Sequence, residues 1–207
     1  MTSDIIPLFS TPLYKGKVEI ENYIDENFLK SFTYTNPDNI GWCSCCNQKI
    51  LLNENLKSLK LEVDRHIDIF LFEVLKIAQG KPIHIQSWIN KHCPDNYSKI
   101  HYHSNSFISG GVYLKCPPHS GKLQFHTPQT PSWSNGTIMP IVSEDNIFNC
   151  DSFGFEVERG DIFIFPSQTL HSVEKNLSNM DRYMIAFNYF LEGTIGNQTG
   201  EISIKVS

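Results

Sequence analysis

Hydrophobic residues recur at helical spacing over one long stretch of this 207-residue chain, residues 53–79. Apolar side chains three and four positions apart lie on one face of a helix, and Gly80 and Pro82 follow in the order that usually ends one. The pattern predicts a helix over Asn53–Gln79 with one face buried, most simply against a sheet. The positions that define this face are Leu56, Leu59, Val63, Ile67, Phe70, Leu71, Val74 and Leu75.

After Pro82 the hydrophobic pattern changes to short runs rich in β-branched and aromatic residues, most of them separated by Pro, Gly, Asn or Ser. Such runs are typical of strands. Glu158–Asp161, which contains Gly160, predicts a tight turn between two of them. The predicted strands are Ile83–Asn90, Phe107–Lys115, Lys122–His126, Phe153–Glu158, Asp161–Phe165, His171–Lys175 and Arg182–Leu191.

The chain ahead of the helix is less regular: Ile5–Val18 is typical of an extended segment, Glu19–Phe32 is weakly helical and Pro37–Gly41 predicts a turn. Helices come first and strands follow without helices between them. This order predicts a mostly β fold with flanking helices, an antiparallel sandwich or barrel with the N-terminal helices packed on one sheet. The length suits a single domain over 1–207, with a strand and helices in 1–82 and the sheet core in 83–207.

Residues 127–152 interrupt the strand pattern as a loop insertion with little periodicity. A loop of this length inside a compact domain is usually functional or disordered. Its apolar content favours a lid or a substrate-binding loop over a flexible tail. The residues concerned are Pro128, Pro131, Trp133, Gly136, Ile138, Met139, Pro140 and Ile141.

Charge and composition exclude several classes of protein. The formal net charge is −5, and no basic run is present, which makes binding to a nucleic-acid backbone improbable. The N-terminus lacks a secretion leader, and the most apolar stretch, Ile67–Ala78, is too short and too charged to cross a membrane. We therefore expect a cytoplasmic protein without a membrane or nucleic-acid partner.

The six cysteines are too few for a disulfide scaffold in a chain of this length, so we expect reduced thiols. Cys43, Cys45 and Cys46 are spaced like half of a zinc site. The sequence offers no second half, and we interpret them as ordinary loop thiols.

Two of the eight histidines, His101 and His103, are separated by one residue in a segment that leads into a strand. Strand geometry would place both imidazoles on one face, where they could chelate one divalent ion. His171 opens a later strand, and an antiparallel barrel could return it to the same place. Among the others, His66 and His119 have ordinary structural interpretations, while the sequence does not decide between a structural and a ligand role for His84, His92 and His126.

Arg182 begins the last predicted strand, and alternation places it on one face with Met184, Ala186 and Asn188. A hairpin at residues 176–179 would set this strand beside that of His171. If the face points inward, the guanidinium is buried without an obvious acidic partner, so a carboxylate ligand is its natural counterion. A surface arginine at a strand end is the simpler interpretation of Arg182 taken alone.

Taken together, these motifs resemble the double-stranded β-helix dioxygenases that use Fe(II) and 2-oxoglutarate, and most closely a subfamily of 2OG-Fe(II) oxygenases from bacteria and phages. The resemblance spans nearly the whole chain. Its blocks are Phe9–Tyr14, His101–Ser106 with Ser109–Leu114, and a late block from Gly160-Asp161 through Phe165-Pro166-Ser167 and His171-Ser172-Val173 to Arg182.

The resemblance implies a jelly-roll, cupin-like core, Fe(II) as cofactor and 2-oxoglutarate as cosubstrate. It implies His101 and His171 as iron ligands and Arg182 as the partner of the distal carboxylate of 2-oxoglutarate, with Tyr113 beside it. Asn188 is a weaker candidate for contact with cosubstrate or substrate. The activity implied is hydroxylation with release of succinate and CO2, with dioxygen and a small-molecule or protein substrate as partners.

The sequence departs from the wider family at two positions. His103 stands where Asp or Glu is usual, so either His103 is the third ligand or that place falls to Asn105, as a weak ligand or a gap; imidazole suits Fe(II) better than a carboxamide, which favours His103. Ala186 replaces a hydroxyl that often helps to hold the cosubstrate. Phe107, Phe125, Phe163 and Phe165 could form apolar pocket walls or simply sandwich core.

Two other functions fit the same residues. One is a cupin-like metalloenzyme with three histidines that does not use 2-oxoglutarate. The other is a non-catalytic β-barrel binding module whose histidine cluster is structural.

Overall fold

Two antiparallel sheets dominate the computed structural model, which describes residues 4–8, 10–36, 41–44, 48–128, 138 and 140–206. In the described residues the large sheet has the order β1-β9-β6-β11-β4-β3-β2, with β12 paired to β11, and the small sheet has the order β5-β10-β7-β8. The strands of the large sheet are β1 (Tyr14–Lys17), β2 (Tyr34–Thr35), β3 (Trp42–Ser44), β4 (Lys81–His92), β6 (Ile108–Lys115), β9 (Asp161–Pro166), β11 (Arg182–Ile195) and β12 (Ile202–Ile204). Those of the small sheet are β5 (Ser98–His101), β7 (Leu123–His126), β8 (Ser152–Phe155) and β10 (Leu170–Val173).

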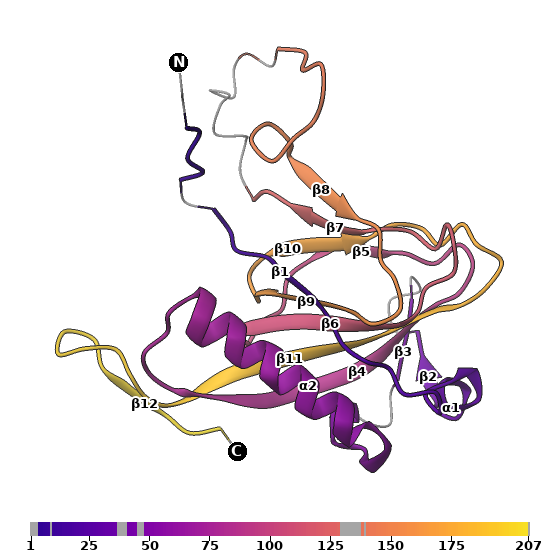
Figure 1. Ribbon diagram of the computed structural model, residues 1–207, viewed down its shortest axis with the longest axis horizontal. Coiled ribbons are helices and arrows are strands. Elements are labelled where there is room, and N and C mark those ends of the chain that lie inside the picture. Colours follow the sequence, from indigo (N-terminus) through magenta and orange to yellow (C-terminus); the bar gives the residue numbers. More distant parts are fainter. Residues whose placement is uncertain are drawn as a thin grey trace.

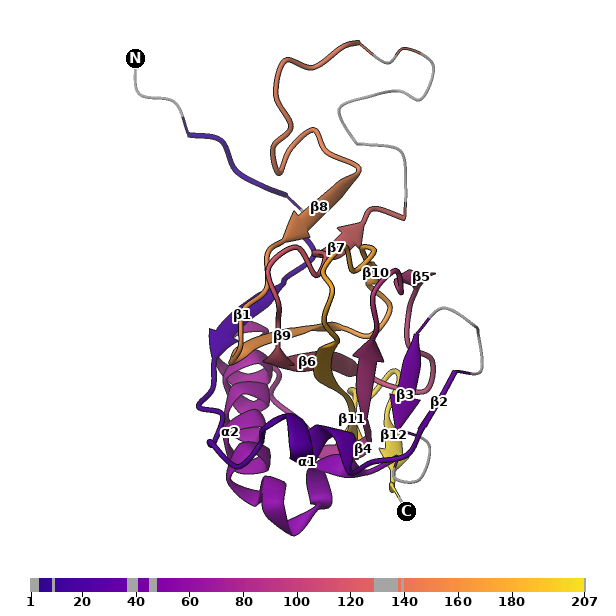
Figure 2. The same cartoon turned by 90° about the vertical axis from the view of Figure 1, so that its right-hand side faces the viewer.

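The large sheet is covered on both faces, and its strands alternate between two cores. Helix α2 (Lys57–Asp68) lies across one face (Figure 1), and the small sheet lies over the other (Figure 2). In β11, Ile185 and Phe187 join the core under α2, whereas Met184 and Ala186 face the small sheet. This arrangement confirms the predicted mostly β fold with N-terminal helices on one sheet.

The predicted helix over Asn53–Gln79 is shorter and less regular than expected. Two 3₁₀ turns, Ile50–Leu52 and Glu54–Leu56, precede α2, and a π-helical turn, Ile69–Val74, follows it. The helical segment ends before Lys76, whose φ of 55° is left-handed, so that Lys76 and not Gly80 makes the reversal. The weakly helical segment contains one short helix, α1 (Glu26–Lys30). None of the helices in the described residues is long and apolar enough to cross a membrane.

The predicted hairpin between the strands of His171 and Arg182 is wrong. β10 belongs to the small sheet and β11 to the large sheet, so the chain crosses from one layer to the other at residues 174–181. The side chain of Asn176 holds this crossing by donating to the carbonyls of His92 and Met180, at 2.9 and 2.8 Å. Because the two layers face each other, the crossing still brings both residues to the same interior.

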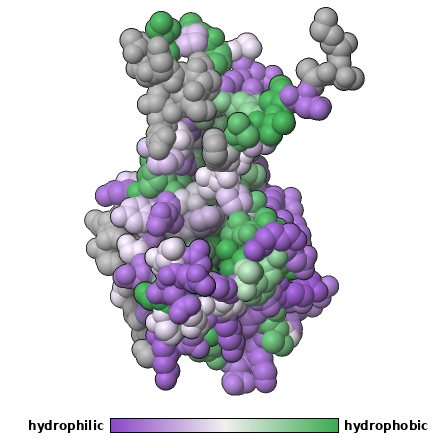
Figure 3. Space-filling model, turned by 90° about the vertical axis from the view of Figure 1, so that its left-hand side faces the viewer, coloured by the Kyte–Doolittle hydropathy of each residue, from purple (hydrophilic) through white to green (hydrophobic). Residues whose placement is uncertain are grey.

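The described part of the loop before β8, residues 140–151, extends beyond the two sheets (Figure 1). Hydrophobic side chains are exposed on this part of the molecule (Figure 3), among them Ile138, Ile141, Ile147 and Phe148. Several residues singled out from the sequence lie outside the described residues: Phe9, Pro37, Cys45, Cys46, Pro131, Trp133, Gly136 and Met139.

Candidate metal centre and its cavity

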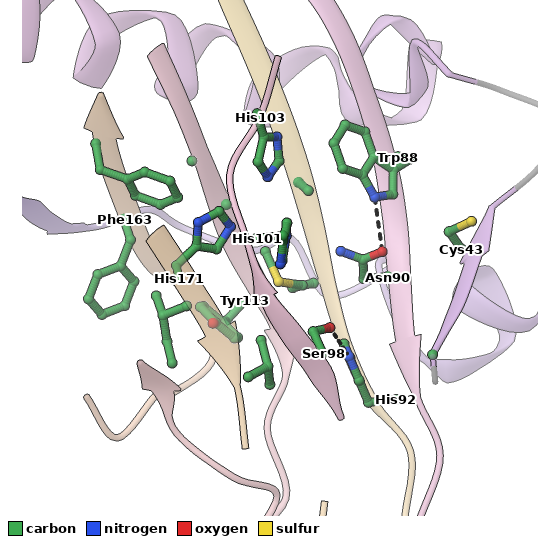
Figure 4. Close-up of a pocket in the computed structure, with 18 of the residues that line it drawn as sticks. Cys43, Trp88, Asn90, His92, Ser98, His101, His103, Tyr113, Phe163 and His171 are labelled. Atoms are coloured by element: carbon green, nitrogen blue, oxygen red, sulfur yellow. Dashed lines mark hydrogen bonds between the residues drawn. The ribbon is translucent and has the colours of Figure 1, made fainter. Parts of the chain in front are cut away.

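His101, His103 and His171 meet between the two sheets. His101 ends β5 and lies directly opposite His171 of β10 in the antiparallel register. His103 lies beyond the end of β5, so strand alternation does not place it, and its backbone N–H instead donates to Ser167 O at 2.9 Å. One ligand atom from each imidazole lies within 4.8 Å of those of the other two. Figure 4 shows the three rings facing a common space.

The nitrogen atoms that point away from this space are all occupied. Nδ1 of His101 donates to Lys99 O at 2.7 Å, and Nδ1 of His171 donates to Thr169 O at 2.9 Å. A histidine whose Nδ1–H is held in this way presents the lone pair of Nε2, the arrangement usual for metal ligands.

His103 is held by a side chain. Its Nδ1 donates to Oδ1 of Asn188 at 2.8 Å, and the same oxygen accepts from the hydroxyl of Ser109 at 2.8 Å. The amide nitrogen of Asn188 donates to Gln86 at 3.3 Å. Asn188 is buried, so its amide is fixed with the oxygen toward His103. Asn105, the alternative ligand, is exposed in a turn with a left-handed φ of 55°.

Burial keeps two of these imidazoles neutral at physiological pH. It lowers the pKa of His171 to about 3 and that of His103 to about 4, with the neighbouring His101 as a further cause in both cases. Neutral imidazoles bind first-row divalent metals well, and three ligands on one side of an ion leave further positions open. The donor chemistry therefore fits Fe(II).

A cavity of about 570 Å³ opens beside the cluster. Trp88 and Asn90 of β4 line one side and Phe163 of β9 the other (Figure 4), and the residues of the described chain that line it include no Asp or Glu. Trp88 stacks on His103 with ring centroids 5.7 Å apart, and its indole N–H donates to Asn90 Oδ1 at 2.9 Å. The ring of Trp88 therefore forms an apolar wall directly against the cluster.

Arg182 is fully buried behind this cavity beside Tyr113, which lines it. Nη1 of Arg182 donates to Ser120 O and Gly121 O at 3.0 and 3.1 Å, whereas Nε, Nη2 and the Tyr113 hydroxyl have no hydrogen-bond partner in the described chain. Nε and Nη2 form the edge of the guanidinium that binds a carboxylate through two parallel hydrogen bonds. Burial lowers the pKa of Arg182, and no carboxylate of the described residues pairs with it, so this edge fits an anionic group.

The other residues singled out from the sequence either line the cavity or have structural contacts elsewhere. Phe163 and Phe165 line the cavity, whereas Phe107 is part-exposed and Phe125 packs on Phe165 without lining the cavity. His66 has the structural role expected, bonded to Tyr14 and Lys17, and His119 lies in an exposed turn. His126 bonds Ser172, and His84 packs on Tyr189.

The sequence analysis missed Trp88 and Asn90 and left the role of His92 open; all three line the cavity from β4. They alternate along one strand face, so the period of two contained the signal. The sequence could not say which face of β4 is inward, because both faces of a central strand are buried.

The family comparison agrees with this geometry. Residues 86–188, which run from β4 into β11, match the model of a protein family described as "Putative 2OG-Fe(II) oxygenase". No curated protein matches the chain by sequence.

Solved structures share the fold at low sequence identity. A prolyl-4-hydroxylase from Pseudomonas putida is 11% identical over 90% of this chain and 96% of that chain, with a TM-score of 0.58. HygX from Streptomyces hygroscopicus, solved with nickel, 2-oxoglutarate and hygromycin B bound, is 13% identical over 86% and 82%, with a TM-score of 0.56. An oxidoreductase of the 2OG-Fe(II) oxygenase family from Burkholderia pseudomallei is 12% identical over 79% and 74%, with a TM-score of 0.54. At these identities the similarity shows the double-stranded β-helix fold alone.

Proposed function

The chain belongs to the 2OG-Fe(II) oxygenase family through residues 86–188, and on that premise we propose that it hydroxylates a substrate with release of succinate and CO2. Fe(II) is the cofactor and 2-oxoglutarate the cosubstrate. When both are bound, one oxygen atom of dioxygen enters the substrate and the other enters succinate. The chain's own residues bind, orient and shield the reactants.

His101, His103 and His171 are the proposed metal ligands. The support is their convergence within 4.8 Å and the acceptors that hold each Nδ1–H. In this role Asn188 positions His103 and does not itself reach the cosubstrate, because its side chain is taken up by His103, Ser109 and Gln86.

Arg182 and Tyr113 bind the distal carboxylate of 2-oxoglutarate in this proposal. The single observation that carries it is the buried guanidinium edge, Nε and Nη2, which has no acceptor among the described residues and lies beside a tyrosine hydroxyl that also has no partner there. Leaving a buried donor unpaired costs about 1–3 kcal/mol, and more for a charged group. An anionic cosubstrate satisfies these donors, whereas neither a cupin-like enzyme without 2-oxoglutarate nor a structural histidine cluster accounts for them.

The walls of the cavity are apolar beside the reacting centre, where His171 is buried, whereas His101 is exposed. Trp88, Phe163 and Phe165 line the cavity with apolar surface next to the histidine cluster, and Met184 covers Gly111 of β6. The fully buried surroundings of Arg182 strengthen its interaction with a carboxylate. The cavity volume suits a small molecule or one side chain of a protein substrate.

We place this reaction in the cytoplasm and expect no nucleic-acid substrate. The support is the free thiols of Cys43, Cys93, Cys116 and Cys150 and the net charge of −5.

Calorimetric titration of the purified full chain tests the proposal. Under anaerobic conditions, Mn(II) should bind with one site per chain, and 2-oxoglutarate should then bind the Mn(II)-loaded protein. His171→Ala should abolish Mn(II) binding. Arg182→Gln should still bind Mn(II) but should bind 2-oxoglutarate at least tenfold more weakly than the wild type. His126→Ala, which removes an imidazole outside the cluster, is the control and should match the wild type.

Succinate formation separates the alternatives. With Fe(II), ascorbate and dioxygen, the wild type should convert 2-oxoglutarate to succinate. Metal binding without any binding or turnover of 2-oxoglutarate would favour the cupin-like enzyme, and failure to bind metal would favour the binding module.

A further inference from the structure

The interior around Arg182 contains a third residue with an unpaired buried polar atom. Besides Nε and Nη2 of Arg182 and the hydroxyl of Tyr113, Nδ1 of His92 has no hydrogen-bond partner in the described chain. His92 is 2% exposed and lines the same cavity as Tyr113. Buried polar atoms are nearly always paired, so unpaired atoms on Arg182 and on two residues that line the cavity point to one missing acceptor.

The sheet register brings His92 to Arg182. The two residues lie directly opposite each other in the antiparallel pair of β4 and β11. Opposite residues of such a pair project to the same face, with Cβ atoms about 4.5–5.5 Å apart. Their side chains therefore project side by side from one face of the sheet. Asn90 and Met184, two residues away along β4 and β11, are the next pair on that face.

The hydrogen bonds of His92 determine what its free nitrogen offers. Nε2 lies 2.9 Å from the hydroxyl of Ser98 (Figure 4). Burial lowers the pKa of His92 to about 3, with the charge of Arg182 as a second cause, so the ring is neutral and carries one proton. When the Ser98 hydroxyl donates to Nε2, that proton is on Nδ1, which then becomes a donor next to a cation.

A donor without an acceptor beside a guanidinium is an unfavourable arrangement that an anion relieves. We propose that His92 is a third cosubstrate-binding residue, which donates from Nδ1 to the distal carboxylate that Arg182 and Tyr113 hold. This assignment rests on the proposed function. A carboxylate accepts up to about four hydrogen bonds; two from the edge of Arg182, one from Tyr113 and one from His92 complete the set.

Two metal-chelating probes of different length test this assignment on the Mn(II)-loaded full chain. N-oxalylglycine carries both the chelating group and the distal carboxylate of 2-oxoglutarate, whereas oxalate carries the chelating end alone. His92→Phe should weaken N-oxalylglycine by about tenfold or more, the size expected for a lost hydrogen bond to a charged group. Oxalate affinity should stay within about twofold, because oxalate does not reach His92.

The matched control is His126→Phe, since His126 is also an imidazole bonded to a serine hydroxyl, at 2.7 Å from Ser172, but does not line this cavity. It should leave both affinities unchanged. His92→Gln keeps a side-chain donor and serves if the Phe variant does not fold; it should bind both probes within about threefold of the wild type. An unchanged affinity for N-oxalylglycine in His92→Phe, or an equal loss with both probes in either variant, overturns the assignment.

The affinities of the wild type for the two probes test the proposed function, on which the role of His92 rests. If N-oxalylglycine binds it no more tightly than oxalate, then no group holds the distal carboxylate, and the proposed function fails before His92 is considered. If N-oxalylglycine binds more tightly and His92→Phe leaves that difference intact, the proposed function stands and only the role of His92 is refuted.

Discussion

Asn188 is the residue on which the third histidine depends. A ligand imidazole needs its second nitrogen held, and His101 and His171 use backbone carbonyls that no substitution removes. His103 uses a side-chain amide, itself fixed by Ser109 and Gln86. The position of His103 is therefore open to mutation in a way that those of the other two are not.

Asn188→Ala should weaken Mn(II) binding by about 10–100-fold, the usual effect of removing a partner of a metal-bound histidine. Asn188→Asp keeps an acceptor for Nδ1–H and should stay within about tenfold of the wild type. Titration calorimetry measures both affinities. Equal losses in the two variants would show that Asn188 matters only for packing.

His103 itself can be tested against the carboxylate that the family usually has. His103→Ala should lose at least tenfold in Mn(II) affinity because it removes one of three ligands, whereas His103→Asp should recover part of that loss, since carboxylates also bind Mn(II) and Fe(II). The variants are compared by electron paramagnetic resonance of Mn(II). If His103→Ala binds Mn(II) as tightly as the wild type, His103 is not a metal ligand, and Asn105 becomes the candidate for the third ligand.

At the level of single residues, the sequence was most informative where chemistry restricts the choice. His101 and His103 could be singled out by their short spacing and Arg182 as a guanidinium on an apolar strand, while His171 needed the further expectation of a barrel that returns the chain. His92 could not be singled out, because a histidine two residues beyond a predicted strand, here Ile83–Asn90, has many ordinary roles. Only the β4–β11 register, which depends on the whole fold, places it opposite Arg182.

Among the elements, β6 is closely packed between its two neighbouring strands and the two cores. A Cβ on Gly110 would overlap the carbonyl oxygen of Phe163 and come within 2.6 Å of the Phe187 ring. Backbone of a central strand cannot shift without disturbing β9 and β11 on either side.

Gly110→Ala should therefore lower the free energy of unfolding by about 1–3 kcal/mol, as overpacking of a core does. Gly154→Ala in the edge strand β8 is the matched control, because its Cβ would meet flexible side chains and no backbone: Lys122, whose Cδ would be 3.1 Å away, and Gln124, whose Cγ would be 3.5 Å away. That substitution should stay within about 0.5 kcal/mol. Urea unfolding measures both, and similar losses in the two variants would contradict the packing argument.

Element identity was easier to predict than element partnership. The strand runs were recognisable because β-branched and aromatic residues cluster between turn residues, yet the hairpin expected at residues 176–179 is a crossing between sheets. A turn signal such as Asn176–Asn179 reports a local reversal and not the sheet that the next strand joins. The helix end was misplaced for a similar reason, since Lys76 adopts a left-handed conformation that is usually left to glycine.

For the whole molecule, the burial of histidine side chains between the two sheets makes the free energy of unfolding depend on pH. His92 and His171 are buried between the layers and His103 is half-buried there, and desolvation lowers their pKa values to about 3, 3 and 4. In the unfolded chain the same groups titrate near pH 6.5. As pH falls below about 6.5, the unfolded chain takes up protons that the folded chain does not, so the folded state loses stability.

The free energy of unfolding of the metal-free protein should therefore decrease from pH 6.5 to 5, by up to about 1.4 kcal/mol per pH unit for each of these groups. Carboxylates contribute separately, at lower pH. Lys115 and Lys30 lower the pKa of Glu26 to about 2, so the stability that ionised Glu26 provides is lost only as pH falls below about 4.5. Urea unfolding at pH 7.5, 6.5 and 5.5 measures the slope. His92→Phe should make the slope shallower, while His119→Asn, on an exposed turn with a φ of 63° that asparagine tolerates, should leave it unchanged. A free energy that is constant over this range would show that these imidazoles are not held neutral by the fold, and the neutral ligand set inferred for the metal centre would lose its physical basis.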